Sequence, residues 1–268
     1  MNPQALFQEL LNAFDDLKIR SGDSCYVTGN ISALAKTKIK KKDLLSIFLN
    51  SCLDVLGSKG TIFSPSASMN LCNTDIPFDI DNTPSNLMGA LAEYIRTAEN
   101  SIRSFHPFWS ISGIGYKAKI LKNVSRHSYG LGSPWTHFID QDAIQINIGL
   151  HPSKAVTLIH HLEVAAGVPY RYSKEFLHPI VKDDGIDYEP FYMSVMYQDT
   201  DIQKKISLNE HFFLALENSG KLNHITLSSG LKMWSFRMKD FAAVATQFFI
   251  EDIYNYLEHP PEIRPYQK

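Results

Sequence analysis

The segment Thr157 to Glu163, TLIHHLE, places a histidine and a glutamate three residues apart in otherwise apolar surroundings. On a helix, His160 and Glu163 share one face, whereas His161 points roughly 100° away. A carboxylate beside an imidazole selects the ring tautomer and raises its basicity, which a general base working near neutral pH requires. The same spacing also occurs in a surface pair and in a buried histidine whose hydrogen bonds are satisfied. The spacing alone leaves both readings open.

Metal chemistry is another use of the same side chains. A metal-dependent hydrolase would employ His160, His161 and Glu163 together, but it needs further ligands at a recognisable spacing, and none stands out. The three cysteines share no metal-binding spacing, and an odd, sparse set is typical of reduced thiols in the cytoplasm. The chain also lacks a phosphate-binding loop and a nucleophile elbow. We therefore expect an enzyme without a metal.

The composition is that of a globular cytoplasmic protein. Of the 268 residues, 44% are hydrophobic, so the chain can bury a substantial core. A formal charge of -2 provides no broad positive field for nucleic acid or anionic lipid. The N-terminal segment resembles an amphipathic helix rather than a signal peptide, and no apolar run is long enough to span a membrane. We expect no nucleic-acid or membrane partner.

The elements around TLIHHLE alternate between strand-like and helix-like patterns. Apolar periodicity predicts strands at 24–29, 60–66, 143–150 (half-buried) and 230–238. It predicts helices at 42–57, 87–98 and 240–259, and one more that begins near Ser153. Residues 180–230 are too irregular to assign. The alternation predicts an α/β fold with a mixed central sheet and helices on both faces. Because no repeat or linker interrupts the chain, we expect a single domain over 1–268.

Several separate segments resemble the aminoglycoside 3-N-acetyltransferase family, the antibiotic N-acetyltransferases. Their order and spacing hold over more than half the chain. The segments are GDSCYVTGNISAL (22–34), GTIFSPS (60–66), PFDIDNTPSNLMGALAEYIR (77–96), IRSFHPFWSISGIG (102–115), RHSYGLGSPW (126–135), INIGL (146–150) and TLIHHLE (157–163). No single segment establishes the resemblance, but the order and spacing of all the segments together do.

The resemblance implies an acyl-CoA-dependent N-acetyltransferase with the family's own fold, which moves an acetyl group from acetyl-CoA to the amine of a sugar. The family's helix histidine and the glutamate three residues later match His160 and Glu163. Direct transfer follows from this match: His160 removes a proton from the amine, and Glu163 orients the ring. No cysteine intermediate is needed. His161 is then a neighbour that packs or hydrogen-bonds.

The resemblance also implies contacts to the coenzyme. A strand-to-helix loop of the family lies along the coenzyme, and backbone N–H groups at a helix start suit its pyrophosphate. The His-Pro-x-x-Ser segment lies near the thioester, where loop N–H groups or the serine hydroxyl would stabilise the oxyanion. A basic stretch beyond the loop either attracts the phosphates or is simply solvated. The matching residues are Asn30, Ile31, Ser32, Ala33, Lys36, His106 and Ser110.

Charged residues bear on the identity of the acceptor. Asp75 and Asp79 lie in a loop that matches the family's acceptor side, where carboxylates bind polycations. Arg171, with Lys174 and His178, instead favours an anionic acceptor. We therefore expect a nucleotide-linked amino sugar, such as a precursor of surface polysaccharide. Aminoglycoside acetylation, which confers antibiotic resistance, is the alternative, and a short acyl group other than acetyl stays open.

The sequence does not define the oligomeric state. Aromatic residues in WSFRMKDF (234–241) and FFIEDIYNY (248–256), which we expect to be exposed, permit a homodimer without requiring one.

Overall fold

A seven-stranded mixed sheet forms the centre of the computed structural model, which describes residues 1–199, 201–202 and 208–263. The strand order is β3-β4-β2-β1-β5-β9-β8. The central strands β2, β1 and β5 are parallel, and the flanking strands pair antiparallel. Their bounds are β1 Ser24–Gly29, β2 Thr61–Pro65, β3 Ile102–Arg103, β4 Ile111–Gly115, β5 Ile144–Ile148, β8 Asn223–Thr226 and β9 Lys232–Arg237. The predicted mixed α/β sheet is confirmed.

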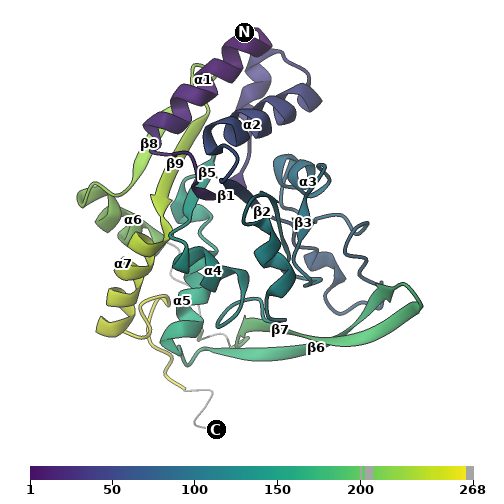
Figure 1. Ribbon diagram of the computed structural model, residues 1–268. Coiled ribbons are helices and arrows are strands. Elements are labelled where there is room, and N and C mark those ends of the chain that lie inside the picture. The colour runs from purple at the N-terminus through teal and green to yellow at the C-terminus, as the bar shows by residue number, and fades with distance from the viewer. Residues whose placement is uncertain (200, 203–207, 264–268) are drawn as a thin grey trace.

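Helices cover both faces of this sheet (Figure 1). Because side chains alternate along a strand, Cys25 and Val27 of β1 face one apolar cluster and Tyr26 faces the other. The first cluster packs α1 (Pro3–Asp16), α2 (Lys41–Leu56) and α3 (Ala90–Arg96). The second packs α4 (Pro134–Asp140), α5 (Leu158–Ala166), α6 (Leu208–Asn218) and α7 (Met238–Glu251). None of these described helices is long and apolar enough to cross a bilayer.

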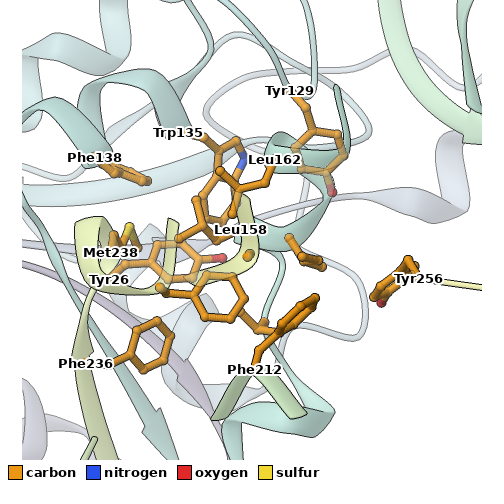
Figure 2. Packing of buried hydrophobic residues seen from close by; sticks show 14 of the residues in the cluster. Tyr26, Tyr129, Trp135, Phe138, Leu158, Leu162, Phe212, Phe236, Met238 and Tyr256 are labelled. Carbon is orange, nitrogen blue, oxygen red and sulfur yellow. The ribbon is translucent and has the colours of Figure 1, made fainter. Parts of the chain in front are cut away.

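The second cluster holds α5 in place. Figure 2 shows the rings of Tyr26, Trp135 and Phe138 gathered with Leu158 and Leu162 of α5. The Trp135 ring centroid lies 5.1 Å from that of Tyr26 and 5.7 Å from that of Phe138. The apolar residues of α5 thereby anchor the helix on the sheet, and its remaining side chains point elsewhere.

A long two-stranded hairpin lies outside the main sheet, and its turn and second strand fall in the stretch 180–230 that the sequence left unassigned. Figure 1 shows β6 (Arg171–Lys182) and β7 (Gly185–Met196) running along one end of the molecule, beside α5. Isolated bridges join Phe78 to Ile180 and His127 to Tyr192. Residues 200 and 203–207 of the unassigned stretch lie outside the described residues. Asp184-Gly185, at the turn, is a hairpin signal that sequence reasoning missed.

Two predicted helices differ from the structure at their ends. The helix expected from Ser153 begins at Leu158, because residues 152–154 form a single 3-10 turn and Ala155 leaves the helical region, with φ of -151° and ψ of 68°. The helix expected to continue to Pro260 ends at Glu251, where Asp252 turns extended.

Strand β5 is buried on both faces rather than half-buried. The side chains of Gln145 and Asn147 are fully buried and hydrogen-bond to each other, 2.8 Å apart. Both amides also donate to the carbonyl of Ala155, at 3.0 and 2.9 Å. The alternation of polar and apolar residues predicts a strand with one solvent-exposed face. The polar side chains are instead buried and hydrogen-bond to the loop that leads into α5.

The aromatic residues proposed for a dimer surface are mostly internal. Phe236, Phe241, Phe249 and Tyr256 all belong to the second apolar cluster and are buried. The expectation that these segments expose their aromatic side chains is therefore wrong.

Candidate active site

His160 and Glu163 are joined by a short hydrogen bond on α5. His160 Nδ1 lies 2.6 Å from Glu163 Oε2. The Glu163 side chain has no exposed surface, whereas that of His160 is 20% exposed. Because an ionised carboxylate only accepts hydrogen bonds, Nδ1 holds the hydrogen and Nε2 is the nitrogen suited to accept a proton. The structure brings the two side chains together, and their catalytic roles stay a prediction.

Arg171, the first residue of β6, reaches back onto this pair. Its Nε forms an ion pair with Glu163 Oε2 at 2.8 Å, and Nη2 lies 3.0 Å from His160 Nδ1. Burial raises the pKa of Glu163, but the hydrogen bond with His160 and the charges of His160 and Arg171 outweigh it, so the pKa is lowered overall. The carboxylate is therefore ionised at neutral pH. The prediction that Arg171 contacts an anionic substrate is not supported, because its guanidinium is already paired with Glu163.

Three tyrosines enclose the pair. The ring centroids of Tyr129 and Tyr256 lie 5.7 and 6.0 Å from that of His160, both edge to face. Figure 2 shows these two rings at one border of the second apolar cluster. Tyr170 is fully buried, and burial together with the negative charge of Glu163 raises the pKa of its hydroxyl. These rings exclude water from one side of His160 and strengthen the electrostatic interactions there.

The larger of two clefts beside α5 opens at the carboxyl ends of the parallel strands. This strand-end cleft has a volume of about 470 Å³. Its walls include Thr28 near the end of β1, Asn30 directly after β1, Pro65 at the end of β2, Trp109, and Thr157 before α5. No charged side chain is among its described lining residues. Ligands of open α/β sheets bind at this edge, and an uncharged lining suits a long, mostly apolar ligand arm.

A smaller cleft of about 290 Å³ lies between α5 and the β6–β7 hairpin. Tyr129, Glu163 and Arg171 line this hairpin cleft. The two clefts are neighbours, because the Trp109 ring in one lies 6.1 Å from the Tyr129 ring in the other. On the segment that forms α5, His160 lies between Thr157, which lines the first cleft, and Glu163, which lines the second, although the described lining of neither cleft includes His160 itself. This arrangement suits transfer of a group between two separately bound molecules.

The loop expected to lie along the coenzyme reaches the strand-end cleft only in part. Asn30 and Ile31 line it. Ser32, Ala33 and Lys36 belong to a short 3-10 helix and are not among its lining residues. The backbone N–H of Ser32 donates to Asn30 Oδ1 at 2.8 Å, so this N–H does not serve as the expected phosphate donor.

His106 and Ser110 are buried and line neither cleft. His106 Nδ1 accepts the N–H of Trp109 at 3.0 Å. The Ser110 hydroxyl donates to the carbonyl of Ser66 at 2.8 Å and accepts from Arg103 at 2.9 Å. Direct contact with the thioester is therefore not supported for either residue. They fix the turn that presents Trp109, a wall residue that sequence reasoning missed although it lies between them.

Asp75 and Asp79 lie near the far end of the hairpin. Phe78, between them, bridges Ile180, and the charge of Asp75 acts on His178. His178 is seven residues beyond Arg171, or roughly 23 Å along a strand. The Asp79 carboxylate accepts the N–H groups of residues 81 and 82 at 2.9 and 3.0 Å and so closes its own turn. The structure does not bring these acids to the His160–Glu163 pair.

His161 points away from His160, into the loop before α4. Its Nδ1 accepts the N–H of Gly130 at 3.2 Å and lies 3.4 Å from the Ser133 hydroxyl. The two histidines therefore occupy separate hydrogen-bonding environments. Among the residues that the structure describes, no group of three histidines, cysteines or acids is placed to hold a metal ion.

Acid should destabilise the fold through His106 and His161. Burial lowers the pKa of each ring to about 4, below the value of about 6.5 in an unfolded chain. The unfolded state therefore takes up protons first, so this stability is complete above pH 6.5 and is lost as the pH falls towards 4. Each ring should remove about 2 kcal/mol from the free energy of unfolding between pH 7 and pH 5.

The variant His106→Asn tests this in denaturant titrations. Asparagine keeps an acceptor for the Trp109 N–H but does not titrate. We expect the difference in stability between the two pH values to shrink by about 2 kcal/mol. An unchanged difference would show that His106 is not held neutral by burial.

Comparisons with known proteins agree with this architecture. The family model for aminoglycoside 3-N-acetyltransferase matches residues 30–250. Aminoglycoside N(3)-acetyltransferase III of Pseudomonas aeruginosa is 24% identical over 197 residues, which cover 65% of this chain and 69% of the relative. Among solved structures, the apoenzyme of AAC(3)-IVa superposes with a TM-score of 0.76 at 20% identity, covering 96% of this chain and 92% of its own. AAC-IIIb in binary complex with CoASH gives 0.77 at 18% identity, covering 95% and 98%.

These matches define an acetyl-CoA-dependent N-acetyltransferase, with acetyl-CoA as co-substrate. The match spans far more than half of the chain. The chain belongs to the aminoglycoside 3-N-acetyltransferase family, and the family resemblance drawn from the sequence is confirmed.

Proposed function

We propose that the whole chain works as one catalytic domain that transfers the acetyl group directly, with His160 as the general base. Acetyl-CoA occupies the strand-end cleft and the acceptor amine approaches from the hairpin cleft. The observation that carries this proposal is the position of His160, with its Nδ1 bound to buried Glu163, on the helix between the two clefts.

The proposed reaction needs one proton acceptor at the amine. A protonated amine has no lone pair with which to attack a carbonyl, so His160 Nε2 takes its proton as the nitrogen attacks the thioester carbon. The new C–N bond forms, the C–S bond breaks, and coenzyme A leaves as a thiolate that is then protonated. Glu163 keeps the Nδ1 hydrogen in place and stabilises the imidazolium. The buried thiols of Cys25 and Cys52, whose pKa values burial raises, take no part.

We propose an aminoglycoside as the acceptor, in preference to a nucleotide-linked amino sugar. The anionic acceptor was inferred from Arg171, Lys174 and His178. Arg171 is paired with Glu163, and His178 is buried, with a pKa lowered by burial. Two of the three cations are thus unsuited to a nucleotide diphosphate. The family match supports the aminoglycoside, and a solved relative, AAC-VIa, is bound to sisomicin.

Thermal stabilisation tests the coenzyme half of the proposal. A ligand at 100 times its dissociation constant adds about 2.7 kcal/mol to the stability of the folded protein, which corresponds to a rise of roughly 5–10 °C in Tm for a chain of this size. We expect such a rise with acetyl-CoA. No rise at saturating coenzyme would contradict the proposal.

A thiol-release assay tests the acceptor half. We expect turnover with sisomicin or another aminoglycoside carrying a free 3-amino group, and a product acetylated at that nitrogen by mass spectrometry and NMR. Nucleotide-linked amino sugars should give no turnover above the background hydrolysis of acetyl-CoA. Turnover with these sugars alone would reverse our choice of acceptor while leaving the acetyltransferase assignment intact.

A further inference from the structure

Arg171 holds an unusual position, since it contacts both members of the proposed catalytic pair and belongs to neither their helix nor the main sheet. Its Nε and Nη2 face Glu163 and His160, at 2.8 and 3.0 Å. Its Nη1 donates to the carbonyl of Ser194 on β7 at 3.2 Å. We propose that Arg171 is a positioning residue that limits how strongly Glu163 holds a proton on His160 and couples the pair to the β6–β7 hairpin. This inference rests on the proposed function.

The hydrogen on His160 Nδ1 decides the geometry. Nδ1 lies 2.6 Å from Glu163 Oε2 and 3.0 Å from Arg171 Nη2. If Nδ1 carries a hydrogen, it can donate to the carboxylate but has no lone pair with which to accept from the guanidinium. Glu163 is closer and ionised, so Nδ1–H donates to it. The guanidinium then faces an N–H that becomes part of a cation when His160 takes up a proton.

The contact with Arg171 affects how readily His160 is protonated. A fully buried carboxylate with an imidazole as its only partner would strongly favour the imidazolium, because an unpaired buried charge is costly. His160 would then already hold a proton near neutral pH and could not accept one from the amine. The ion pair with Arg171 satisfies part of the Glu163 charge, and the adjacent positive charge disfavours protonation of His160.

Five titratable side chains contribute to this balance among the residues that the structure describes. They are Glu163 on α5, Arg171 on β6, Tyr129 before α4, Tyr170 before β6 and Tyr256 after α7. The hydroxyls of Tyr129 and Tyr170 are neutral at the pH of the reaction, since burial raises their pKa values. Within the described part of the chain, Arg171 supplies the positive charge that is paired with Glu163 beside His160.

Hydrogen bonds extend this arrangement into the hairpin cleft. Ser194, whose carbonyl accepts from Arg171, donates its own N–H to the Ser128 hydroxyl oxygen, at 3.2 Å. Arg171, Ser194 and Ser128 all line the hairpin cleft. If binding of the amine substrate shifts the hairpin, it would thus also shift the Arg171 guanidinium relative to His160.

Titration of the His160 ring by NMR tests the proposal without any substrate. We expect Arg171→Met to raise the midpoint of this titration by about one pH unit or more, because the opposing positive charge is lost. Arg171→Lys keeps the charge and should leave the midpoint close to that of the parent protein. The matched control is Arg126→Met, which removes a cation paired with Glu189 on the same hairpin and should not move it. A midpoint that Arg171→Met leaves unchanged would overturn the inference.

Turnover supplies the second readout. For Arg171→Met, the acid limb of the kcat/KM profile should move to higher pH together with the His160 midpoint. For Arg171→Lys, we expect kcat to fall about tenfold with the acid limb in place, because an ammonium cannot bridge Glu163 and the Ser194 carbonyl as a guanidinium does. Full turnover in Arg171→Lys would contradict the positioning role, even if Arg171→Met does not fold.

The same measurements separate this inference from the proposed function. If a His160 variant keeps full turnover, then His160 is not the base, and the proposed function fails whatever Arg171 does. If that variant is inactive while neither Arg171 variant changes the titration or kcat, the proposed function stands and the role of Arg171 fails.

Discussion

The variant His160→Asn should lose roughly 10²- to 10⁴-fold in kcat while binding acetyl-CoA as tightly as the parent protein. The asparagine amide can still donate to Glu163 from the position of Nδ1, so the buried carboxylate keeps its partner. Only the proton-accepting nitrogen Nε2 is removed. Stopped-flow or steady-state thiol release gives kcat, and calorimetry gives the affinity for the coenzyme.

The neighbouring histidine provides the matched control for this variant. His161→Asn keeps an acceptor for the Gly130 N–H, and His161 does not touch the proposed reaction path. It should therefore cost stability but leave kcat within a few-fold of the parent value. Equal losses in the two variants would mean that α5 as a whole, rather than one ring, is needed, and normal kcat in His160→Asn would exclude His160 as the base.

The variant Gly29→Ala should lose about 3 kcal/mol or more of stability. Gly29 ends β1 with φ of +124°, a conformation that residues with a side chain rarely adopt. An added Cβ would stand 2.0 Å from the carbonyl oxygen of Ile148 on β5, which is backbone and cannot rotate away. Strands β1 and β5 would have to separate at Gly29, which lines the strand-end cleft. Denaturant unfolding measures the loss.

Gly22→Ala isolates the conformational part of that cost. Gly22 also has positive φ, +88°, but a Cβ there would meet no atom within 4 Å. It should lose only about 1–2 kcal/mol. If the two variants were equally destabilised, the close approach of β1 to β5 would contribute nothing to the loss of stability in Gly29→Ala. A folded fraction of Gly29→Ala should also show weakened stabilisation by acetyl-CoA.

The sequence predicts the central layer of the fold well because burial there follows simple periodicity. The strands at β1, β2 and β9 and the helix α2 fall where apolar spacing places them. The prediction is wrong where polar residues are buried for structural reasons. Gln145 and Asn147 alternate with isoleucines as surface residues would, yet they bind the Ala155 carbonyl inside the molecule.

In the candidate site, too, the sequence predicts the contact within one helix but not the contact that depends on tertiary packing. The contact between His160 and Glu163 was predictable because both lie on one helix, where spacing determines which side chains meet, whereas their proposed roles come from the family resemblance. The position of Arg171 depends on the direction in which the chain runs from α5 into β6. Tertiary packing, rather than local sequence, determines this direction. Its charge alone suggests an anion receptor, whereas the acid it pairs with, Glu163, lies eight residues earlier in the chain. Asp79 and Ser110 were assigned by their match to segments of the family, while hydrogen bonds to backbone groups occupy both side chains.

The adjacency of the two clefts has a consequence for inhibition. Each cleft opens beside the same helix, and the rings of Trp109 and Tyr129 stand together where they meet. A pantetheine arm and an aminoglycoside joined by a short linker in place of the transferred acetyl group could occupy both clefts at once. The second half would then bind at an effective concentration in the millimolar range, so the joined molecule could exceed either half in affinity by about 10²- to 10⁴-fold. A linker that cannot pass His160 would give no such gain.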